Sequence, residues 1–427
     1  MNYFLLAIVS FGMFTFGYSQ QVTSSELKDI EAKVIQWRRH FHQNPELSNR
    51  EFNTAKTIAK HLKSLGIETQ ENVAKTGVVG ILRGAQKGKV VALRADIDAL
   101  PVKERNDLEF KSTVVTEYVG KEVGVMHACG HDTHIAILMG VAELLSKHKK
   151  KIKGTVKFIF QPAEEGAPEG EEGGAELMVK EGVLKNPEVD AIFGLHISST
   201  LDVGKIRYKP RGIMAAAQSF RIDVKGKQSH GSRPWGGVDP IVASAKIIDG
   251  LQTIISREVD LTNEGAVITV GKIESGVRSN IIPESATMIG TIRTLDYKMQ
   301  KQINDRMNEM VPSIAKTYRA EATISIEKGY PITYNDVALT KMALPTLQKV
   351  AGKNNVLLTK AITGAEDFSF FQKEIPGFYF FLGGKSKNDE NPYPHHTPDF
   401  LIDESGLILG VKAMYQLSLD YLNQKAI

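Results

Sequence analysis

The single cysteine of this 427-residue chain lies in the segment Met126-His-Ala-Cys-Gly-His-Asp-Thr-His134, which constrains the fold and chemistry more than any other segment. One thiol and three imidazoles fall within eight residues here, next to the carboxylate of Asp132. A lone cysteine is usually a small buried core residue. Thiolate, imidazole and carboxylate together, however, are the ligands that zinc and similar divalent metals prefer. The segment therefore favours a metal site over a core position.

Length and composition indicate a globular protein of two domains. The chain is too long for one ordinary core, and 42% hydrophobic with 24% charged residues is usual for a folded protein. The net charge of +4 is small. The lysines at 147 and 149–151 form a run that is typical of a solvated helix end. Because no stretch interleaves aromatic and basic residues, we expect no nucleic-acid partner.

We expect residues 1–19 to be a signal peptide. Residues 2–18 are almost wholly apolar, and Gly17 and Ser19 are small residues near the expected cleavage point. The rival interpretation is a membrane anchor, but the run lies at the lower limit for crossing a bilayer. The sequence thus predicts an exported protein, periplasmic or secreted, with no stable membrane anchor after cleavage. In an oxidising compartment a single thiol needs burial or a metal for protection, which favours ligation.

Apolar periodicity predicts an α/β fold for the two flanks of the chain. Residues 24–66 show helical spacing, and a helix over 133–147 is expected to start with Asp132 as its N-cap. Further elements alternate: strands at 89–94, 156–160, 191–195 and 378–382, and helices at 175–181 and 337–351. This alternation is typical of a catalytic domain with a mostly parallel central sheet flanked by helices.

The middle of the chain has a different pattern. Its predicted order is strand 219–225, helix 239–256, strands 266–270 and 286–294, helix 298–317 and strand 322–327. This β-α-β-β-α-β order fits a ferredoxin-like α+β unit. We therefore expect an inserted domain over residues 212–328. It would interrupt a discontinuous catalytic domain made of residues 24–211 and 329–427.

Chemically reactive side chains follow the predicted strands. They are Asp96 and Asp98 after strand 89–94, Glu164 and Glu165 after strand 156–160, His196 after strand 191–195, and His395 and His396 beyond strand 378–382. Any one of these motifs alone is ordinary, because strands end in polar surface connections. Open α/β sheets, however, bind ligands outside the carboxyl ends of their strands. We expect these side chains to meet the cysteine segment in space.

The adjacent pair Glu164 and Glu165 suggests a division of labour. Two neighbouring carboxylates cannot easily both point at one ion. One is expected to ligate a metal while the other accepts a proton from the water that the metal activates.

Four motifs together resemble those of bacterial and plant N-acyl-amino-acid amidohydrolases, within the wider aminoacylase–carboxypeptidase metallohydrolase family. That group includes hippurate hydrolases, aminoacylases and indole-acetyl-amino-acid hydrolases. The motifs are Arg94-Ala-Asp-Ile-Asp-Ala-Leu-Pro101, the His127–His134 segment, Pro162-Ala-Glu-Glu-Gly166 and Thr363-Gly-Ala-Glu-Asp-Phe368. The resemblance extends from about residue 26 to residue 424. Its motifs are specific for the family and not for a substrate.

The resemblance implies two divalent metal ions, with Cys129 as a candidate bridge. The implied ligands are Cys129, His131, Glu165, His196 and His396. It makes Glu164 the general base and Asp98 a carboxylate that fixes the ligands from behind, while we interpret His134 as structural. Zinc, manganese, nickel and cobalt all accept such a mixed ligand set, so the sequence does not select the metal.

The resemblance also assigns roles within the insert, which it implies to be a lid and a dimerisation surface. His230 would stabilise the developing oxyanion, and Asn280 and Arg293 would hold the substrate carboxylate, for which a guanidinium offers a fork of donors. The alternatives are a loop imidazole without a catalytic role for His230 and a surface ion pair for Arg293. A homodimer is expected.

The sequence thus predicts a metal-dependent hydrolase that cleaves the amide bond of a small N-acyl amino acid. One alternative is a dipeptidase, an aminoacyl carboxypeptidase or an N-acetyl-diaminopimelate-type deacetylase with the same metal residues. Another is a non-catalytic binding protein with a structural metal, against which the general base Glu164 argues. The acidic, glycine-rich loop 166–174 lies where substrate would enter, and it leaves substrate size and charge open.

Overall fold

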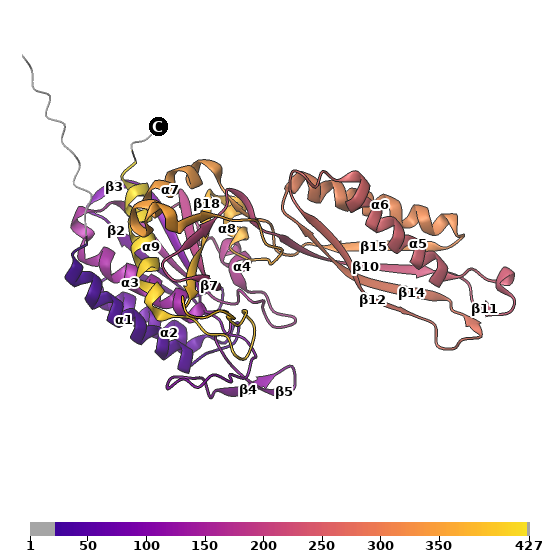
Figure 1. Cartoon of the computed structure of the whole chain (residues 1–427), viewed down its shortest axis with the longest axis horizontal. Coiled ribbons are helices and arrows are strands. Elements are labelled where there is room, and N and C mark those ends of the chain that lie inside the picture. The colour runs from indigo at the N-terminus through magenta and orange to yellow at the C-terminus, as the bar shows by residue number, and fades with distance from the viewer. Residues whose placement is uncertain (1–21, 425–427) are drawn as a thin grey trace, which may run out of the picture.

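The computed structural model describes residues 22–424, which form two units on separate β-sheets (Figure 1). The expected signal peptide, residues 1–19, lies outside the described residues. Within residues 22–424, no helix has both the length and the apolar character that a membrane span requires. One unit uses both flanks of the chain, and the other uses its middle.

The larger unit contains an eight-stranded sheet whose central strands are parallel, as predicted. The strand order is β1-β2-β6-β3-β7-β18-β8-β17, and the neighbours within β6-β3-β7-β18 run parallel. β2 joins β6 and β8 joins β18 in antiparallel register. The strands are β1 Glu68–Val73, β2 Gly77–Arg83, β3 Gln86–Asp96, β6 Lys153–Gln161, β7 Ala191–Asp202, β8 Ile206–Tyr208, β17 Val356–Leu358 and β18 Gly377–Lys385.

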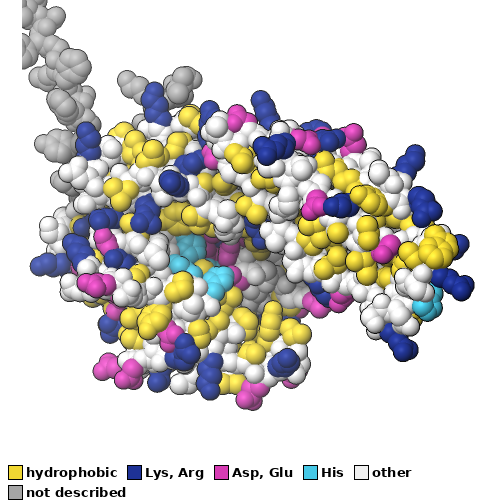
Figure 2. Space-filling view, turned by 45° about the vertical axis from the view of Figure 1, so that its right-hand side comes forward, with side chains coloured by type: hydrophobic (Ala, Val, Ile, Leu, Met, Phe, Trp, Pro, Cys, Tyr) yellow, Lys and Arg dark blue, Asp and Glu magenta, His cyan; other side chains and the backbone are white. Residues whose placement is uncertain are grey.

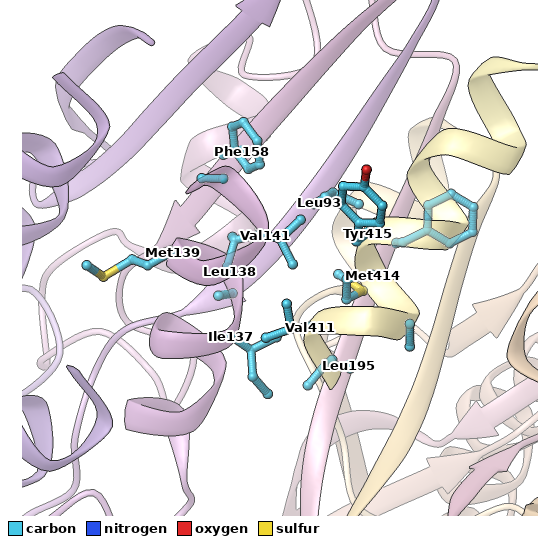
Figure 3. Close-up of a cluster of buried hydrophobic side chains, with 14 of the residues drawn as sticks. Leu93, Ile137, Leu138, Met139, Val141, Phe158, Leu195, Val411, Met414 and Tyr415 are labelled. Atoms are coloured by element: carbon cyan, nitrogen blue, oxygen red, sulfur yellow. The ribbon is translucent and has the colours of Figure 1, made fainter. Parts of the chain in front are cut away.

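Helices cover both faces of this sheet. One face carries α1 Ser24–Gln43, α2 Phe52–Ser64, α3 His131–Lys147, α7 Val337–Ala351 and α9 Leu407–Leu422, and the other carries α4 Gly174–Lys180 and α8 Ser369–Glu374. Figure 3 shows α3 and α9 packed on the sheet, with Val141 and Val411 facing Leu93 and Leu195. Each such side chain contributes about 1.5–3 kcal/mol by its burial. The core therefore holds α3, which carries part of the candidate site, firmly against the strands.

The first helical region, expected over residues 24–66, is interrupted at residues 44–51. It forms α1 and α2 with a break between them. Pro45 cannot continue a helix because it lacks an N–H, and Asn49 has a left-handed backbone with φ of 61°. Glu46 accepts hydrogen bonds from the N–H groups of Asn53 and Thr54 at 2.9 and 2.8 Å, which caps α2 from within the break.

The start of α3 also differs, because Asp132 is not its N-cap. The helix begins at His131 after Gly130, whose φ is 89°. A Cβ at position 130 would lie 2.4 Å from Ile197, so this turn requires glycine. Asp132 instead pairs with Arg38 at 2.9 Å inside the first turn. Cys129 consequently lies in a tight turn directly before the helix.

The smaller unit is a four-stranded antiparallel sheet covered on one face by two helices. Its strand order, β12-β14-β10-β15, together with the chain order confirms the ferredoxin-like arrangement. Its elements are β10 Ala216–Lys225, α5 Pro240–Thr253, β12 Ala266–Ser275, β14 Ser285–Thr294, α6 Tyr297–Thr317 and β15 Glu321–Glu327. It has a core of its own, which includes Phe220, Ile247 and Ile303. The insert can therefore keep its shape while its position relative to the larger unit changes.

Short ladders lie at the two ends of the insert. β9 Arg211–Met214 pairs with β16 Thr333–Asn335 where the insert joins the larger unit. β11 Ser229–His230 pairs with β13 Ile281–Ile282 at the opposite end, far from the large sheet (Figure 1). A separate hairpin of the larger unit consists of β4 Val115–Tyr118 and β5 Lys121–Gly124.

Candidate metal centre and active-site cavity

Potential metal ligands from separate segments meet over one part of the large sheet. Figure 2 shows histidine side chains beside acidic ones in a hollow near the middle of the molecule. The segments are the turn before α3 with Cys129, the first turn of α3 with His131, the loop after β6 with Glu164 and Glu165, strand β7 with His196, and the loop after β18 with His396. The structure therefore brings together the five side chains that the resemblance implies as ligands, and Glu164 with them.

Cys129 is common to two groups of potential ligands. Its Sγ lies 3.4 Å from His196 Nε2 and 3.3 Å from His396 Nε2. The ligand atoms of Cys129, His131 and His196 lie within 4.8 Å of one another, and so do those of Cys129, Glu165 and His396. Each group is compact enough for one divalent ion, and the shared thiol suits a bridge between two ions.

Asp98 orients the imidazole of His131 and holds the backbone of Glu165. His131 Nδ1 lies 2.9 Å from the backbone oxygen of Asp98 and 3.2 Å from its Oδ1. Nδ1 therefore donates its hydrogen, and the Nε2 lone pair is left to ligate. Asp98 Oδ2 also accepts hydrogen bonds from the Glu165 N–H at 3.0 Å and the Ser48 hydroxyl at 2.7 Å.

His131 Nε2 itself indicates that a cation belongs here. This nitrogen is buried and has no hydrogen-bond partner among residues 22–424. Carboxylate oxygens of Glu164, Glu165 and Asp96 surround it at 3.8, 3.9 and 3.9 Å. Burial lowers the pKa of His131, but the carboxylates of Asp96 and Asp98 outweigh burial and raise it to about 10. A divalent cation would satisfy both the nitrogen and the surrounding oxygens, so the donor set fits a metal.

The charges around the thiol give the same indication. Burial raises the pKa of Cys129 well above its usual value, and the carboxylates of Glu165 and Glu164 raise it further. Burial also raises the pKa of Glu164, with Glu366 and Glu165 as the next causes. A bound cation favours thiolate and carboxylate over their protonated forms, so it would oppose these shifts.

His134 lies beside the ligands but has both ring nitrogens occupied. Its Nδ1 donates to Asp96 at 2.5 Å, and its Nε2 accepts the N–H of Ile197 at 2.8 Å. These contacts support the structural interpretation. They tie the first turn of α3 to β3 and β7.

His395 has a role that the sequence pattern did not indicate. Its Nε2 accepts the Ser199 N–H at 3.3 Å, so Nδ1 donates to the backbone oxygen of Cys129 at 3.1 Å. Burial lowers the pKa of His395 to about 4, which keeps the ring neutral. The next residue, His396, has a left-handed backbone with φ of 63°, and this turn lets two adjacent imidazoles take different partners.

A fully buried ion network lies next to Glu164. Arg94 contacts Asp96, Glu366 and Asp367 at 2.6, 2.9 and 3.0 Å. Carboxylate oxygens of Glu164, Glu366 and Asp367 lie within 4.8 Å of one another. These residues belong to the motifs at residues 94–101 and 363–368, from which no role for them could be inferred. Arg94 and Asp96 belong to the carboxyl end of the buried strand β3, and Glu366 and Asp367 come just before α8.

A cavity of about 440 Å³ opens onto the candidate centre. Residues of the candidate metal centre form one side of the cavity. Other residues, including Met214, Ile362, Phe381 and Arg207, form the other side. Tyr330, at the junction with the insert, also lines the cavity, and its hydroxyl donates to the backbone oxygen of Glu164 at 2.8 Å. The centre is thus accessible to a small molecule.

The structure does not bring the insert residues to this cavity. His230 and Asn280 lie at the far end of the insert, where the Gly231 N–H donates to the Asn280 oxygen at 2.8 Å. Ser232 donates through its hydroxyl to His230 Nδ1 at 2.8 Å. Arg293 lies near the junction end, where it pairs with Ala217 across β14 and β10. The roles of these three residues stay predictions.

The acidic loop 166–174 is held to the body of the larger unit. Glu171 accepts from Arg50 and Lys75, both at 2.6 Å, and from Asn49 at 3.0 Å. The side-chain hydrogen bonds of Arg50 and Lys75 lower the pKa of Glu171. At least this carboxylate of the loop is therefore engaged with cations of the protein itself.

The chain is similar in sequence to known proteins over more than nine tenths of its length. A family model described as peptidase family M20/M25/M40 matches residues 92–420. Thermostable carboxypeptidase 2 of Saccharolobus solfataricus is 43% identical over 402 residues, which cover 94% of this chain and 98% of the relative. N-acetyl-L-cysteine deacetylase of Bacillus subtilis is 36% identical and covers 91% and 88%.

A solved structure agrees as well. A Bacillus subtilis protein described as a dinuclear metal binding peptidase of the M20 family superposes with a TM-score of 0.78 at 34% identity, covering 92% of this chain and 99% of that one. Its description matches the two overlapping ligand groups that share Cys129 here. From the sequence similarity and from the centre it explains, we conclude that this chain belongs to peptidase family M20/M25/M40 and is a metal-dependent enzyme that hydrolyses amide bonds.

Proposed function

We propose that the enzyme hydrolyses N-acyl amino acids to a carboxylic acid and a free amino acid. The observation that carries this proposal is the position of Glu164, whose carboxylate lines the cavity with Oε2 3.8 Å from the free nitrogen of His131. The cavity has the size of a small-molecule site. One relative is named as a deacetylase of N-acetyl-L-cysteine, a substrate of this class.

The five residues Cys129, His131, Glu165, His196 and His396 are our assigned metal ligands. Divalent ions held there supply Lewis acidity, which polarises a carbonyl and lowers the pKa of water toward about 7. Glu164 takes the proton of the attacking water and passes it to the leaving nitrogen. Burial, with Glu366 and Glu165 nearby, raises the pKa of Glu164, which favours its role as a proton acceptor.

We also propose a homodimer in which His230 and Asn280 serve the cavity of a second copy. Ten-residue strands separate these residues from the junction end, a distance of about 30 Å at ~3.3 Å per residue. A rigid insert cannot present both its far end and Arg293 to its own cavity. Two observations support a surface where two copies could pair. β12 is an edge strand among the described residues, and such an edge offers unpaired backbone groups. The apolar side chains of Val267 on β12 and Ile289 on β14 are 42% and 37% exposed.

Mixing two inactive variants tests this arrangement. Glu164→Gln and His230→Ala protomers, exchanged together, should recover up to about a quarter of wild-type activity, since half of random dimers are mixed and each has one complete site. No recovery of activity, together with a monomer by analytical ultracentrifugation, would contradict the proposed homodimer.

We further propose export, supported by the apolar residues 2–18. Immunodetection in the periplasm or medium, against retention in the cytoplasm, tests it.

A substrate panel on reconstituted protein tests the main proposal. Metal-stripped enzyme is loaded in turn with zinc, manganese, nickel or cobalt and given N-acetyl, N-benzoyl and aminoacyl derivatives of the same amino acids. We expect metal-dependent release of free amino acid from the N-acyl compounds. If only the aminoacyl compounds are cleaved, the enzyme is a dipeptidase or carboxypeptidase. That second candidate is favoured by the name of the 43% identical relative.

A further inference from the structure

Arg207 is a cation that faces the cavity without a carboxylate partner. It belongs to β8, is partly buried and lines the same cavity as the candidate metal ligands. Within residues 22–424, no acidic side chain forms an ion pair with its guanidinium, whereas the fully buried Arg38 and Arg94 both have one. Leaving a partly desolvated charge unpaired is unfavourable, and a bound anion would offset this cost.

The sheet register places Arg207 at a defined distance from the centre. His196 of β7 pairs with Phe381 of β18, and Phe381 pairs with Arg207 of β8. These three residues form a row across adjacent strands, so their side chains project from the same face of the sheet. Two strand spacings, about 9–10 Å, separate the backbone of His196 from that of Arg207.

The middle of this row is apolar, while Ser198, Thr200 and Thr359 supply polar lining elsewhere in the cavity. Phe381 occupies the middle of the row, and Met214 and Ile362 line the cavity beside it. A ligand that reaches from the centre to the guanidinium must therefore lay an apolar segment over the Phe381 ring. It must then end in an anion.

The α-carboxylate of the amino acid does not meet this requirement. It lies about 3.8 Å or less from the scissile carbonyl carbon, with no methylene chain between them. A carboxylate at the far end of the acyl group meets this requirement, because an apolar chain separates it from the scissile carbonyl. In a five-carbon diacid the two carboxyl carbons are about 5 Å apart, and a carboxylate–guanidinium contact adds about 4 Å, so the total of about 9 Å is close to two strand spacings.

We propose that Arg207 binds a second carboxylate at the distal end of the acyl group. The preferred substrates would then be amino acids acylated by a dicarboxylic acid, with glutaryl near the best length. This inference rests on the proposed function, since it names the acyl class that the same site accepts. Arg207 would bind the carboxylate through its fork of two N–H donors.

Matched acyl groups test the inference. The assay compares kcat/KM for N-glutaryl and N-valeryl derivatives of one amino acid, which differ in a terminal carboxylate, and adds succinyl and adipoyl for length. The wild type should favour glutaryl over valeryl by at least tenfold. Arg207→Met should lower this ratio at least tenfold, Arg207→Lys should lower it less, and Arg207→Glu should invert it.

Lys360→Met is the control, because Lys360 is an exposed cation next to the cavity residue Thr359 in the sequence but does not itself line the cavity. It should leave the ratio unchanged. Equal turnover of glutaryl and valeryl substrates by the wild type would overturn the inference, as would an equal loss on both in Arg207→Met. In either case the N-acyl hydrolase itself would stand.

A binding measurement separates failure of the inference from failure of the proposed function. If no N-acyl amino acid is hydrolysed, the proposed function fails. Calorimetric binding of N-glutaryl-amino acid to Glu164→Gln protein still tests Arg207. The added Arg207→Met change should weaken binding at least tenfold, and unchanged affinity would sink the inference independently of turnover.

Discussion

Replacing Glu164 by glutamine should remove the general base while it keeps the shape of the side chain. Glu164 lines the cavity, and its Oε2 is 3.8 Å from His131 Nε2. General base catalysis typically contributes about 10²–10⁴ in rate. We therefore expect kcat/KM to fall by about 10²–10⁴, equivalent to about 2.7–5.4 kcal/mol of transition-state free energy.

The same change should not weaken the fold. Burial, with Glu366 and Glu165 nearby, raises the folded-state pKa of Glu164 above its unfolded value. Stability from such a group is full below the unfolded pKa and is lost as pH rises through the folded pKa. Metal-free Glu164→Gln protein should therefore have a melting temperature equal to or above the wild type at pH 8.

The assay combines steady-state kinetics, metal content by elemental analysis and thermal unfolding, with Glu165→Gln as the matched control. We expect Glu164→Gln to retain its metal, and Glu165→Gln to lose metal because Glu165 belongs to the Cys129 and His396 group. The assignment of the base would be refuted if metal-loaded Glu164→Gln kept more than a tenth of the activity. Metal loss equal to that of Glu165→Gln would also refute it.

Three further predictions follow from the same contacts. Cys129→Ser should reduce metal content, and the shift in melting temperature on adding a chelator should shrink, because Sγ lies within 3.4 Å of two imidazoles; an unchanged shift would exclude the thiol as a ligand. Arg94→Met should destabilise the protein by about 3–5 kcal/mol in urea unfolding, since it leaves buried carboxylates without their cation; a loss below 1 kcal/mol would contradict this. Burial lowers the pKa of His61, so the unfolded chain binds its proton more readily and stability should fall as pH drops below about 6.5. His61→Phe should reduce the difference in melting temperature between pH 7.5 and 5.5, and an undiminished difference would argue against this residue.

The sequence predicted the fold where local pattern and tertiary structure agree. Helix 337–351 coincides with α7, and the strand and helix order of the insert is that of the ferredoxin-like unit. The prediction was wrong at residues 44–51 and at Asp132. Pro45 ends α1 in a loop that spacing alone did not reveal, and Asp132 is drawn into a buried ion pair with Arg38 instead of capping α3.

The candidate site was predictable as a set of residue types but not as a network. His131, Glu165 and His196 stood out because metal chemistry needs such donors. The part played by His395 depends on a left-handed backbone at His396, which no sequence periodicity encodes. Arg207 could not be predicted as a cavity residue from the sequence. Its position beside the centre depends on strand register, and its partner Phe381 in the sheet is distant along the chain.

The pairing of β7 with β18 sets an order for biosynthesis. Residues 191–202 can pair early with β3, but they find their second neighbour only when residues 377–385 have left the ribosome, and the whole insert is made in between. The insert has its own core and can fold during this wait, whereas closure of the large sheet must bridge a long loop of chain. Because His396 is synthesised last of the assigned ligands, we expect tight metal capture to follow completion of the polypeptide. Nascent chains stalled at residue 370 should bind zinc more weakly than chains stalled well beyond residue 427 on an added C-terminal linker.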